Sequence, residues 1–372
     1  MKIAAFNVEN MFDRPKAFNL DDNTQSSKII KKAAQLNALF EKKTYSAANK
    51  ASMIALMMDL DLGKSDRGDF VLLRKIRGKI VKRANTGLQI VANGRDDWIG
   101  WVELKTAPVN ETAVLNTARV IHEADADVLA VIEAENRVSL NLFSEKLLQQ
   151  VGGTPYPHVM VIDGNDTRGI DVGIMTKADY KIGTMRSHIH DLKADGHPVF
   201  SRDCPEYAVT ASNGECVWVL PNHFKSKFGG DNSSSRAKRE AQAARVAEIY
   251  QSLRAAGENN VVVLGDFNDT PNSAPLQPLL ANTDLRDVGE HPSFDTGQFP
   301  GHGTYALGND NQKIDYLLLS PALFNRVTAS GLMRKGAWPG SRPKRWDVFP
   351  TLTHKVHAAS DHHLIWAEIN GL

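Results

Sequence analysis

Seven short apolar runs, rich in β-branched residues, recur along the chain and predict buried β-strands. Most of them are continuous rather than alternating, which is typical of strands that are covered on both faces. The runs are Ile3–Val8, Val128–Ile132, Val172–Met175, Cys216–Leu220, Val261–Leu264, Ile314–Leu319 and Leu364–Ile369. Helical patterns lie between several of these runs, so we expect an α/β protein with layered sheets and outer helices.

One of the intervening helices is marked at both ends. Apolar residues repeat at helical spacing from Val246 to Leu253. Three serines at 233–235 predict the N-cap of this helix, and Gly257 predicts its C-terminal stop. A further helix is predicted over residues 111–123, leading directly into a predicted strand.

The segment from residue 13 to residue 108 has a different pattern. Amphipathic helices are predicted near residues 29–40 and 53–60, and a strand at Trp98–Val102. A basic run lies between Lys64 and Arg83. Because the sequence has no internal repeat, low-complexity tract or obvious flexible linker, we expect one domain over residues 1–372 that carries this segment as an elaboration.

Composition limits the class of protein but does not indicate a binding partner. Hydrophobic residues make up 42% of the 372 residues, and 44 Lys and Arg balance 43 Asp and Glu, so bulk charge indicates no polyanionic partner. Cys204 and Cys216 are too few for a disulfide framework, and their redox state is left open. No apolar stretch approaches the length that crosses a bilayer, and no signal-peptide pattern precedes the first strand. We therefore expect a cytoplasmic protein without stable membrane insertion.

Polar residues gather at the margins of five predicted strands. They are Asn7 with Glu9, Glu133, Asn222 with His223, Asp266 with Asn268, and Asp361 with His362. This distribution indicates a site, because α/β sheets bind their ligands beyond the strand ends. Asp266 and Asn268 stand two residues apart, and in an extended segment their side chains would point the same way. A base beside a hydrogen-bond donor suits the attack of water on phosphorus.

Six short motifs, in this order, resemble the endonuclease/exonuclease/phosphatase superfamily. They are Phe6–Asn10, Asp127–Glu133, Asn222–Ser226, Gly265–Asn268, Ile314–Tyr316 and Ser360–His362. The resemblance spans nearly the whole chain and implies a four-layer α/β sandwich, in which two mixed β-sheets pack face to face with helices outside. It also implies hydrolysis of a phosphoester by water with a divalent metal ion, Mg²⁺ in most members and Mn²⁺ as the alternative.

The resemblance implies a metal site around Glu133. Asn7, Glu9 and Asp361 would complete or support the ligand shell, and hard carboxylate oxygens suit Mg²⁺ or Mn²⁺. Glu135 lies two residues beyond Glu133 and competes for the same place, although the spacing within the motif favours Glu133.

Five further residues receive catalytic roles by the same resemblance. Asp266 would orient and deprotonate the attacking water, and Asn268 would donate to a phosphate oxygen. His362 would contact the phosphate while Asp315 orients its imidazole, and His223 would be a second phosphate contact.

Four residues are weaker candidates for substrate contact. They are Arg168, Asn222, Lys225 and Ser226. For Arg168 and Lys225 the competing interpretation is an ordinary solvated side chain. His363 neighbours His362, but we expect its side chain to point the opposite way and to be structural.

Two loops combine cations with tryptophan, and they bear on the substrate. One comprises residues 64–83 followed by Trp98 and Trp101, and the other runs over residues 334–346 and ends at Trp346. Cations with interleaved aromatic residues suit backbone contact and base stacking on nucleic acid. The competing interpretation places the tryptophans in the core and the cations on a solvated face.

These patterns favour a DNA endonuclease or exonuclease, with nucleic acid as substrate. A phosphatase or a sphingomyelinase-like lipid phosphodiesterase is the alternative within the same class, and the apolar stretch 53–60 is compatible with a lipid surface. A catalytically silent nucleic-acid-binding module is the alternative from a different class. It is disfavoured because every matched position carries a residue that is competent for catalysis.

Overall fold

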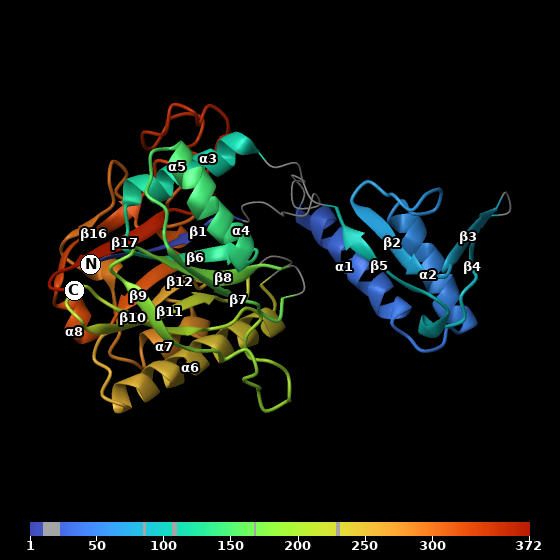
Figure 1. The fold of residues 1–372 in the computed structure, drawn as a ribbon, viewed down its shortest axis with the longest axis horizontal. Coiled ribbons are helices and arrows are strands. Elements are labelled where there is room, and N and C mark those ends of the chain that lie inside the picture. Colours follow the sequence, from blue (N-terminus) through green and yellow to red (C-terminus); the bar gives the residue numbers. More distant parts are fainter. Residues whose placement is uncertain (10–22, 85–86, 106–109, 167–168, 228–230) are drawn as a thin grey trace. The chain divides into compact units, whose positions relative to one another are not determined.

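The structure of the protein is a computed structural model, which describes residues 1–9, 23–84, 87–105, 110–166, 169–227 and 231–372. The chain divides into two units (Figure 1): unit 1 comprises Met1–Phe12 with Val109–Leu372, and unit 2 comprises Asp13–Pro108. The bounds of unit 2 coincide with the segment that the sequence sets apart. That the whole chain forms one domain carrying this segment as an elaboration stays a prediction.

The first sheet of unit 1 is mixed and has seven strands. At its centre, β1 pairs parallel with β6 and antiparallel with β17. From edge to edge the strands are β14 (Phe294–Asp295), β16 (Val327–Met333), β17 (Leu364–Ile369), β1 (Lys2–Asn7), β6 (Val128–Ala134), β8 (Asp171–Thr176) and β7 (His158–Ile162).

The second sheet of unit 1 is also mixed and has six strands. Here β11 and β12 pair parallel, and the neighbouring pairs on either side of them are antiparallel. In order the strands are β13 (Arg286–Asp287), β15 (Asp315–Leu319), β12 (Val261–Asp266), β11 (Cys216–His223), β10 (Glu206–Thr210) and β9 (Lys181–Arg186).

The two sheets pack face to face, with helices on their outer faces (Figure 1). One buried core holds residues of both sheets, such as Ile3 and Val128 from the first and Val219 and Val262 from the second. Two further cores lie beneath the helices. The helices over the first sheet are α3 (Glu111–Ala124), α4 (Arg137–Leu142) and α5 (Leu148–Gln150), and those over the second are α6 (Ser233–Ala255) and α7 (Gln277–Leu280), with the short α8 (Pro321–Phe324) after β15. The predicted four-layer α/β sandwich is confirmed.

The two ends of α6 test the predicted N-cap at residues 233–235 and the predicted stop at Gly257. The side chain of Asn232 caps the helix by accepting a hydrogen bond from the backbone amide of Ser235 at 2.9 Å. The predicted serine cap is therefore wrong by one residue, because asparagine caps a helix as well as serine does. Gly257 follows the helix in the left-handed conformation (φ +90°), as a C-terminal stop requires.

Unit 2 has a hydrophobic core of its own. Trp98 is completely buried there, packs edge-on against Phe40 at 4.8 Å, and donates a hydrogen bond to the hydroxyl of Tyr45 at 2.9 Å. The elements around this core are α1 (Asn23–Phe40), α2 (Ala47–Asp59), the pair β2 (Val71–Arg77) and β5 (Ile99–Leu104), and the hairpin β3 (Val81–Ala84) with β4 (Gly87–Ile90). Across the described residues of both units, no helix has the length and apolar character that a membrane crossing requires.

Candidate active site

The carboxyl ends of two parallel strand pairs, one from each sheet, carry the polar residues of the motifs. Asn7 ends β1 and lies beside Ile132 of β6. His223 and Asp266 end β11 and β12 and are paired in register. Asp315 begins β15 directly opposite Asp266. The sheet topology thus gathers residues that lie far apart in the sequence.

Asp266 is buried at the centre of this group. Its Oδ2 atom accepts hydrogen bonds from Asn7 Nδ2 at 3.2 Å and from Asn268 Nδ2 at 3.0 Å, and it lies 3.5 Å from His223 Nε2. Burial, reinforced by the facing carboxylate of Asp315, raises the pKa of Asp266 to about 7. A carboxyl group with this pKa accepts and releases a proton near neutral pH.

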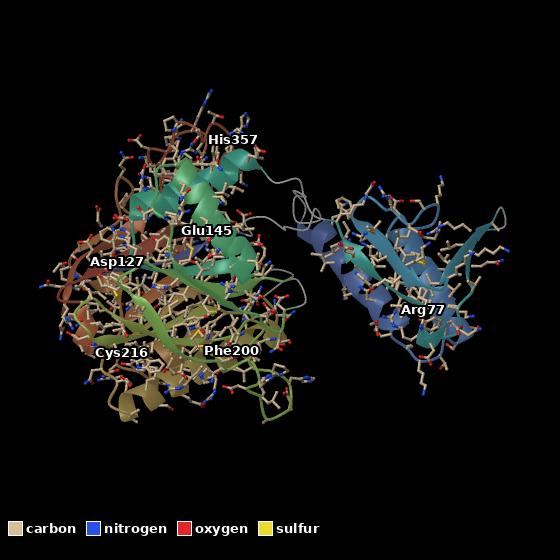
Figure 2. All side chains as sticks on the ribbon, in the orientation of Figure 1. Arg77, Asp127, Glu145, Phe200, Cys216 and His357 are labelled. Atoms are coloured by element: carbon tan, nitrogen blue, oxygen red, sulfur yellow. The ribbon has the colours of Figure 1, made fainter. Side chains whose placement is uncertain are left out.

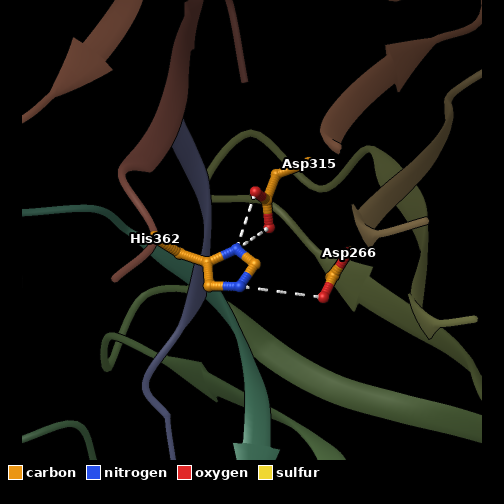
Figure 3. A group of neighbouring side chains, drawn as sticks. All are labelled: Asp266, Asp315 and His362. Atoms are coloured by element: carbon orange, nitrogen blue, oxygen red, sulfur yellow. Dashed lines mark hydrogen bonds and ion pairs between the residues drawn. The ribbon is translucent and has the colours of Figure 1, made fainter. Parts of the chain in front are cut away.

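The imidazole of His362 lies between two carboxylates (Figure 3). Its Nδ1 atom is 2.9 and 3.1 Å from the two oxygens of Asp315, and its Nε2 atom is 4.0 Å from Asp266 Oδ2. Burial alone would lower the pKa of His362, but the Asp315 carboxylate and its neighbours outweigh burial and raise this pKa well above its usual value. A raised pKa favours the protonated form of the ring, which Asp315 contacts through Nδ1.

Further carboxylates border the two histidines. Glu133 Oε1 lies 3.8 Å from His223 Nε2, and Asp361 Oδ1 lies 3.8 Å from His362 Nε2. The backbone amide of Asp361 donates to Glu9 Oε2 at 3.3 Å. Five carboxylates and two imidazoles are therefore linked in one set of contacts. This excess of negative charge and of hard oxygen donors fits a divalent cation such as Mg²⁺ or Mn²⁺.

Three candidate site residues have left-handed backbone conformations although none of them is glycine. The φ angles are 53° at Glu9, 69° at Glu133 and 54° at Asn268. Such conformations cost free energy and gather at functional sites. Glu133 also interrupts the register of β6 with β8 between Ile132 and Ala134, as a bulge that redirects a side chain does.

Asn268 contacts Asp266, but its backbone conformation differs from the predicted one. β12 ends at Asp266, and Asn268 lies in a turn rather than in an extended segment, so the predicted extended geometry is wrong. The turn lets Asn268 donate to Asp266 through both its backbone amide at 2.8 Å and its side-chain amide. The side-chain amide also donates to the carbonyl of Phe224 at 3.2 Å. Both amide hydrogens of Asn268 thus hold the loop and Asp266 in place.

Gly265, the residue before Asp266, cannot carry a side chain. Its φ is +127°, and a Cβ atom would lie 2.1 Å from the carbonyl oxygen of Asn222. Glycine is therefore needed for the close pairing of β11 and β12 at the site.

A stack of three aromatic rings supports the site from the outer side of the second sheet. Phe224 and Tyr316 stack on the two faces of Phe267, with centroid distances of 4.7 and 4.8 Å. Each ring belongs to the residue that immediately follows a polar site residue. Strand alternation therefore sends the polar side chains toward the site and the rings into the core beneath α6.

A buried ion pair behind this loop was not predicted from the sequence. Asp269 accepts a hydrogen bond from Arg239 Nε at 2.9 Å and pairs with Lys227 at 2.5 Å, and its backbone carbonyl accepts from the Tyr316 hydroxyl at 2.9 Å. Arg239 and Asp269 are both buried. The only signal in the sequence is an additional acid directly after the Gly-Asp-Phe-Asn motif.

Tyr305 was also missed. Its ring lies 4.9 Å from the ring of His362, and the backbones of the two residues form an isolated antiparallel bridge. The nearby carboxylate of Asp361 raises the pKa of Tyr305, so the phenol stays protonated. No motif marks this residue in the sequence.

Asn222 does not join the site, contrary to its predicted contact with substrate. It is buried, donates to the carbonyl of Leu220 at 2.9 Å, and lies beside the thiol of Cys204. The physical reason is strand alternation, which turns Asn222 away from the side that His223 faces. Cys204 and Cys216 are both free thiols.

Lys225 and Ser226 follow β11 in the loop next to His223. The ammonium group of Lys225 donates to the carbonyl of Ser226 at 2.8 Å, and the backbone amide of Lys225 donates to Gln242 at 2.8 Å. Their contact with substrate stays a prediction. Arg168 lies outside the described residues.

The tryptophans of the two basic loops are mostly structural. Trp98 is fully buried, and Trp346 is 5% exposed and donates to the carbonyl of Ala337 at 3.1 Å. Arg334 is buried against the Trp346 ring and donates to the carbonyl of Gly303 at 2.9 Å. The prediction that Trp98 and Trp346 stack on bases is therefore wrong, because Trp98 fills the core of unit 2 and Trp346 is buried against Phe299, Arg334 and His363. His363 packs edge-on against Trp346 at 5.0 Å, away from the site.

The family model described as Endonuclease/Exonuclease/phosphatase family matches residues 103–335, which is more than half of the chain. The protein belongs to this family, whose members are hydrolases that act on phosphoester bonds and typically use a divalent metal ion. The predicted family resemblance is confirmed.

Two solved structures from Bacteroides thetaiotaomicron share the fold. The mannosyl-6-phosphatase matches with a TM-score of 0.50 and 15% sequence identity, covering 69% of this chain and 90% of that one. A protein described by the same family name matches with a TM-score of 0.50 and 15% identity, covering 68% and 85% of the two chains. At this identity the likeness concerns the fold alone. No curated protein sequence matches the chain.

Among the described residues, one group brings three possible metal ligands close together. Asp266, Asp315 and His362 present ligand atoms that all lie within 4.8 Å of one another. However, a protonated imidazole has no lone pair to give to a metal, and the raised pKa of His362 favours that state. That Glu133 and Asp361 hold a metal ion stays a prediction; their carboxylates lie 3.8 Å from His223 Nε2 and His362 Nε2, respectively.

Proposed function

We propose that the protein is a divalent-metal-dependent phosphodiesterase that cleaves nucleic acid, with DNA as the expected substrate of an endonuclease or exonuclease. The observation that carries the proposal is the buried carboxyl of Asp266, which lies 3.5 Å from His223 and 4.0 Å from His362; burial raises the pKa of Asp266 to about 7, and the raised pKa of His362 favours its cationic form. A base beside a fixed cation suits the attack of water on a phosphate anion.

In the proposed reaction, Asp266 orients a water molecule and accepts a proton from it as the oxygen attacks phosphorus. Asn7 and Asn268 hold the carboxylate in place through their amide groups. His362 binds a phosphate oxygen and offsets the charge that develops there, while Asp315 keeps the Nδ1 proton in position. No covalent intermediate is required.

Glu133, Glu9 and Asp361 are the residues that would hold the metal ion. When bound, the ion neutralises phosphate charge and stabilises the leaving oxygen. Asn7 acts as support for this group, since its Oδ1 atom accepts a hydrogen bond from the backbone amide of Glu9 at 3.0 Å.

Nucleic acid is favoured over lipid by the surface of unit 2. Arg77, Lys79 and Lys82 of the basic run are exposed, as cations that bind a polyanion must be. By contrast, Met53 and Met57 of the apolar stretch are completely buried. The side of α2 that carries Met53 and Met57 packs in the core of unit 2, which weakens the case for a lipid-binding helix.

The test is an assay of the full chain with Mg²⁺ or Mn²⁺ on plasmid DNA, single-stranded DNA, RNA, sphingomyelin, an inositol phosphate, a sugar phosphate and bis(4-nitrophenyl) phosphate. EDTA is expected to abolish cleavage. Asp266→Asn and Glu133→Gln are each expected to lower the rate by about 10²-fold or more. Glu145→Gln, at an exposed site labelled in Figure 2, serves as the matched control.

Two outcomes would overturn the proposal. Cleavage of nucleic acid that survives both Asp266→Asn and Glu133→Gln would remove the assigned site. Hydrolysis of the lipid or of a phosphate monoester without hydrolysis of nucleic acid would instead indicate the alternatives in the same class.

A further inference from the structure

The balanced charge of the chain conceals two oppositely charged units. Residues 13–108, which form unit 2, contain 18 Lys and Arg against 11 Asp and Glu. The rest of the chain contains 26 Lys and Arg against 32 Asp and Glu. Unit 1 therefore carries a net charge of the same sign as a nucleic acid, and the attraction for a polyanion comes from unit 2.

The β2–β5 pair of unit 2 has one covered face and one open face. Val71, Leu73 and Val102 lie in the core beneath α1 and α2. On the opposite face Trp101 is 40% exposed and lies directly across from Arg74, and the neighbouring Ile76 is 68% exposed. A large ring on an open strand face is available to stack on a planar partner.

Several cations of the basic run stabilise the fold of unit 2. Lys75 and Arg83 both pair with Asp66, and Arg74 pairs with Glu103. Arg83 also donates to the carbonyls of Leu62 and Ser65 at 2.9 Å. These cations are therefore engaged within the unit.

Three other cations of this run are directed to solvent. Arg77 (labelled in Figure 2), Lys79 and Lys82 are exposed and form no ion pair within the part of the chain that the structure describes. Arg77 pairs with Ile99 in the β2–β5 ladder, two residues from Trp101. Lys79 follows Gly78, which touches the backbone just before β5. Arg77 and Lys79 thus lie close to the strand that carries the exposed Trp101, and Lys82 follows three residues after Lys79, on β3.

We propose that Ile76, Arg77, Lys79 and Trp101 on the β2–β5 pair, with Lys82 on the following strand β3, bind single-stranded nucleic acid; these five residues are here called the basic-aromatic surface. The cations contact backbone phosphates, and Trp101 stacks on an unpaired base. This inference rests on the proposed function, because it assigns the capture of the polymeric substrate to unit 2 and its hydrolysis to unit 1. A strand held by one unit is at high effective concentration for the other, since the two are covalently joined.

A single strand fits this surface better than a duplex or a membrane. Bases in a duplex are stacked on one another, so an exposed ring gains little from them. Binding to an anionic bilayer would be favoured by a cluster of exposed apolar side chains, whereas Ile76 and Trp101 stand beside the exposed side chains of Arg74 and Arg77.

The first test measures binding of a labelled single-stranded oligonucleotide to the full chain by fluorescence anisotropy, without metal and over a range of salt. The triple variant Arg77→Glu/Lys79→Glu/Lys82→Glu is expected to weaken binding by about 10-fold or more. It is also expected to reduce the salt slope by about 2, because each phosphate that is no longer neutralised lowers that slope by about 0.7. Trp101→Ala is expected to weaken binding roughly 5- to 150-fold, and Trp101→Phe to restore most of it, because the ring is kept.

A matched control reverses three exposed cations elsewhere in unit 2, Lys28→Glu/Lys31→Glu/Lys43→Glu. Its change in net charge is the same, so an equal loss of affinity in the control would overturn the assignment to the basic-aromatic surface. Tighter binding of duplex DNA or of phosphatidylserine vesicles through this surface would overturn the assignment to single strands. A melting temperature for each variant separates weakened binding from impaired folding.

Hydrolysis of bis(4-nitrophenyl) phosphate distinguishes this inference from the proposed function. We expect the surface variants to hydrolyse this small diester at the wild-type rate while KM for single-stranded DNA rises. Normal DNA cleavage and binding by the triple variant would refute the inference alone. Specific DNA binding without hydrolysis of any diester would refute the proposed function alone.

Discussion

Replacing Asp315 with asparagine tests how His362 acts. The two carboxylate oxygens lie 2.9 and 3.1 Å from His362 Nδ1, and both residues are buried. Asparagine has nearly the same shape, and Thr304 Oγ1 accepts a hydrogen bond from the backbone amide of residue 315, which the substitution keeps. The fold is therefore expected to persist, so that any change in rate reports on the imidazole.

The size of the effect follows from the charged hydrogen bond that the substitution removes. A buried hydrogen bond to a charged group contributes about 1.5–3 kcal/mol. If the cationic ring is needed in the transition state, this corresponds to a decrease of about 10- to 150-fold in kcat/KM. Because Asp315 raises the pKa of His362, its removal lowers that pKa, and the alkaline limb of the pH profile moves to lower pH.

The assay measures kcat/KM for bis(4-nitrophenyl) phosphate across the pH range at saturating Mg²⁺. Asp310→Asn is the matched control, because the Asp310 side chain is 81% exposed. We expect this control to match the wild type. An Asp315→Asn protein with wild-type kcat/KM and an unmoved alkaline limb would refute the role given to His362.

Two further predictions concern stability, each measured by urea unfolding. Arg239→Ala is expected to lower the free energy of unfolding by about 3–5 kcal/mol, because it removes the buried cation that pairs with the buried Asp269. Arg236→Ala, on the same helix and 61% exposed, is expected to cost less than about 1 kcal/mol, and equal losses would contradict the argument. Burial lowers the pKa of His363 in the folded protein. Above pH ~6.5 the side chain is neutral in both the folded and the unfolded state, whereas at lower pH only the unfolded state takes up the proton, so the free energy of unfolding falls. Between about pH 7.5 and 5.5 the wild type is expected to lose about 1.4 kcal/mol more than His363→Phe. A pH-independent difference between the two would contradict this.

The central strands were predictable because burial on both faces restricts their composition. Val261–Leu264 and Leu364–Ile369 are found as β12 and β17 with little change in their bounds. The edge strand β9 (Lys181–Arg186) was not predicted. It is exposed along most of its length, and its pairing with β10, a partner distant in the sequence, defines it.

The motifs found the polar residues of the site, but they could not give the direction of each side chain. Asn222 and His223 are neighbours in one motif, yet strand alternation separates them. The left-handed turn at Asn268 was not predicted, because asparagine does not require it as glycine often does. Trp346 is buried by Arg334 and His363, contacts that the local sequence does not specify.

The left-handed backbones of Glu9, Glu133 and Asn268 limit which substitutions can stabilise this protein. Glycine adopts that conformation without strain, so glycine at any of these positions would relax the backbone. The same substitution would remove a carboxylate or an amide from the candidate site. Selection for thermal robustness and selection for chemistry therefore oppose each other at these three positions. Substitutions that raise thermal stability are better placed at surface positions and helix ends away from the candidate site.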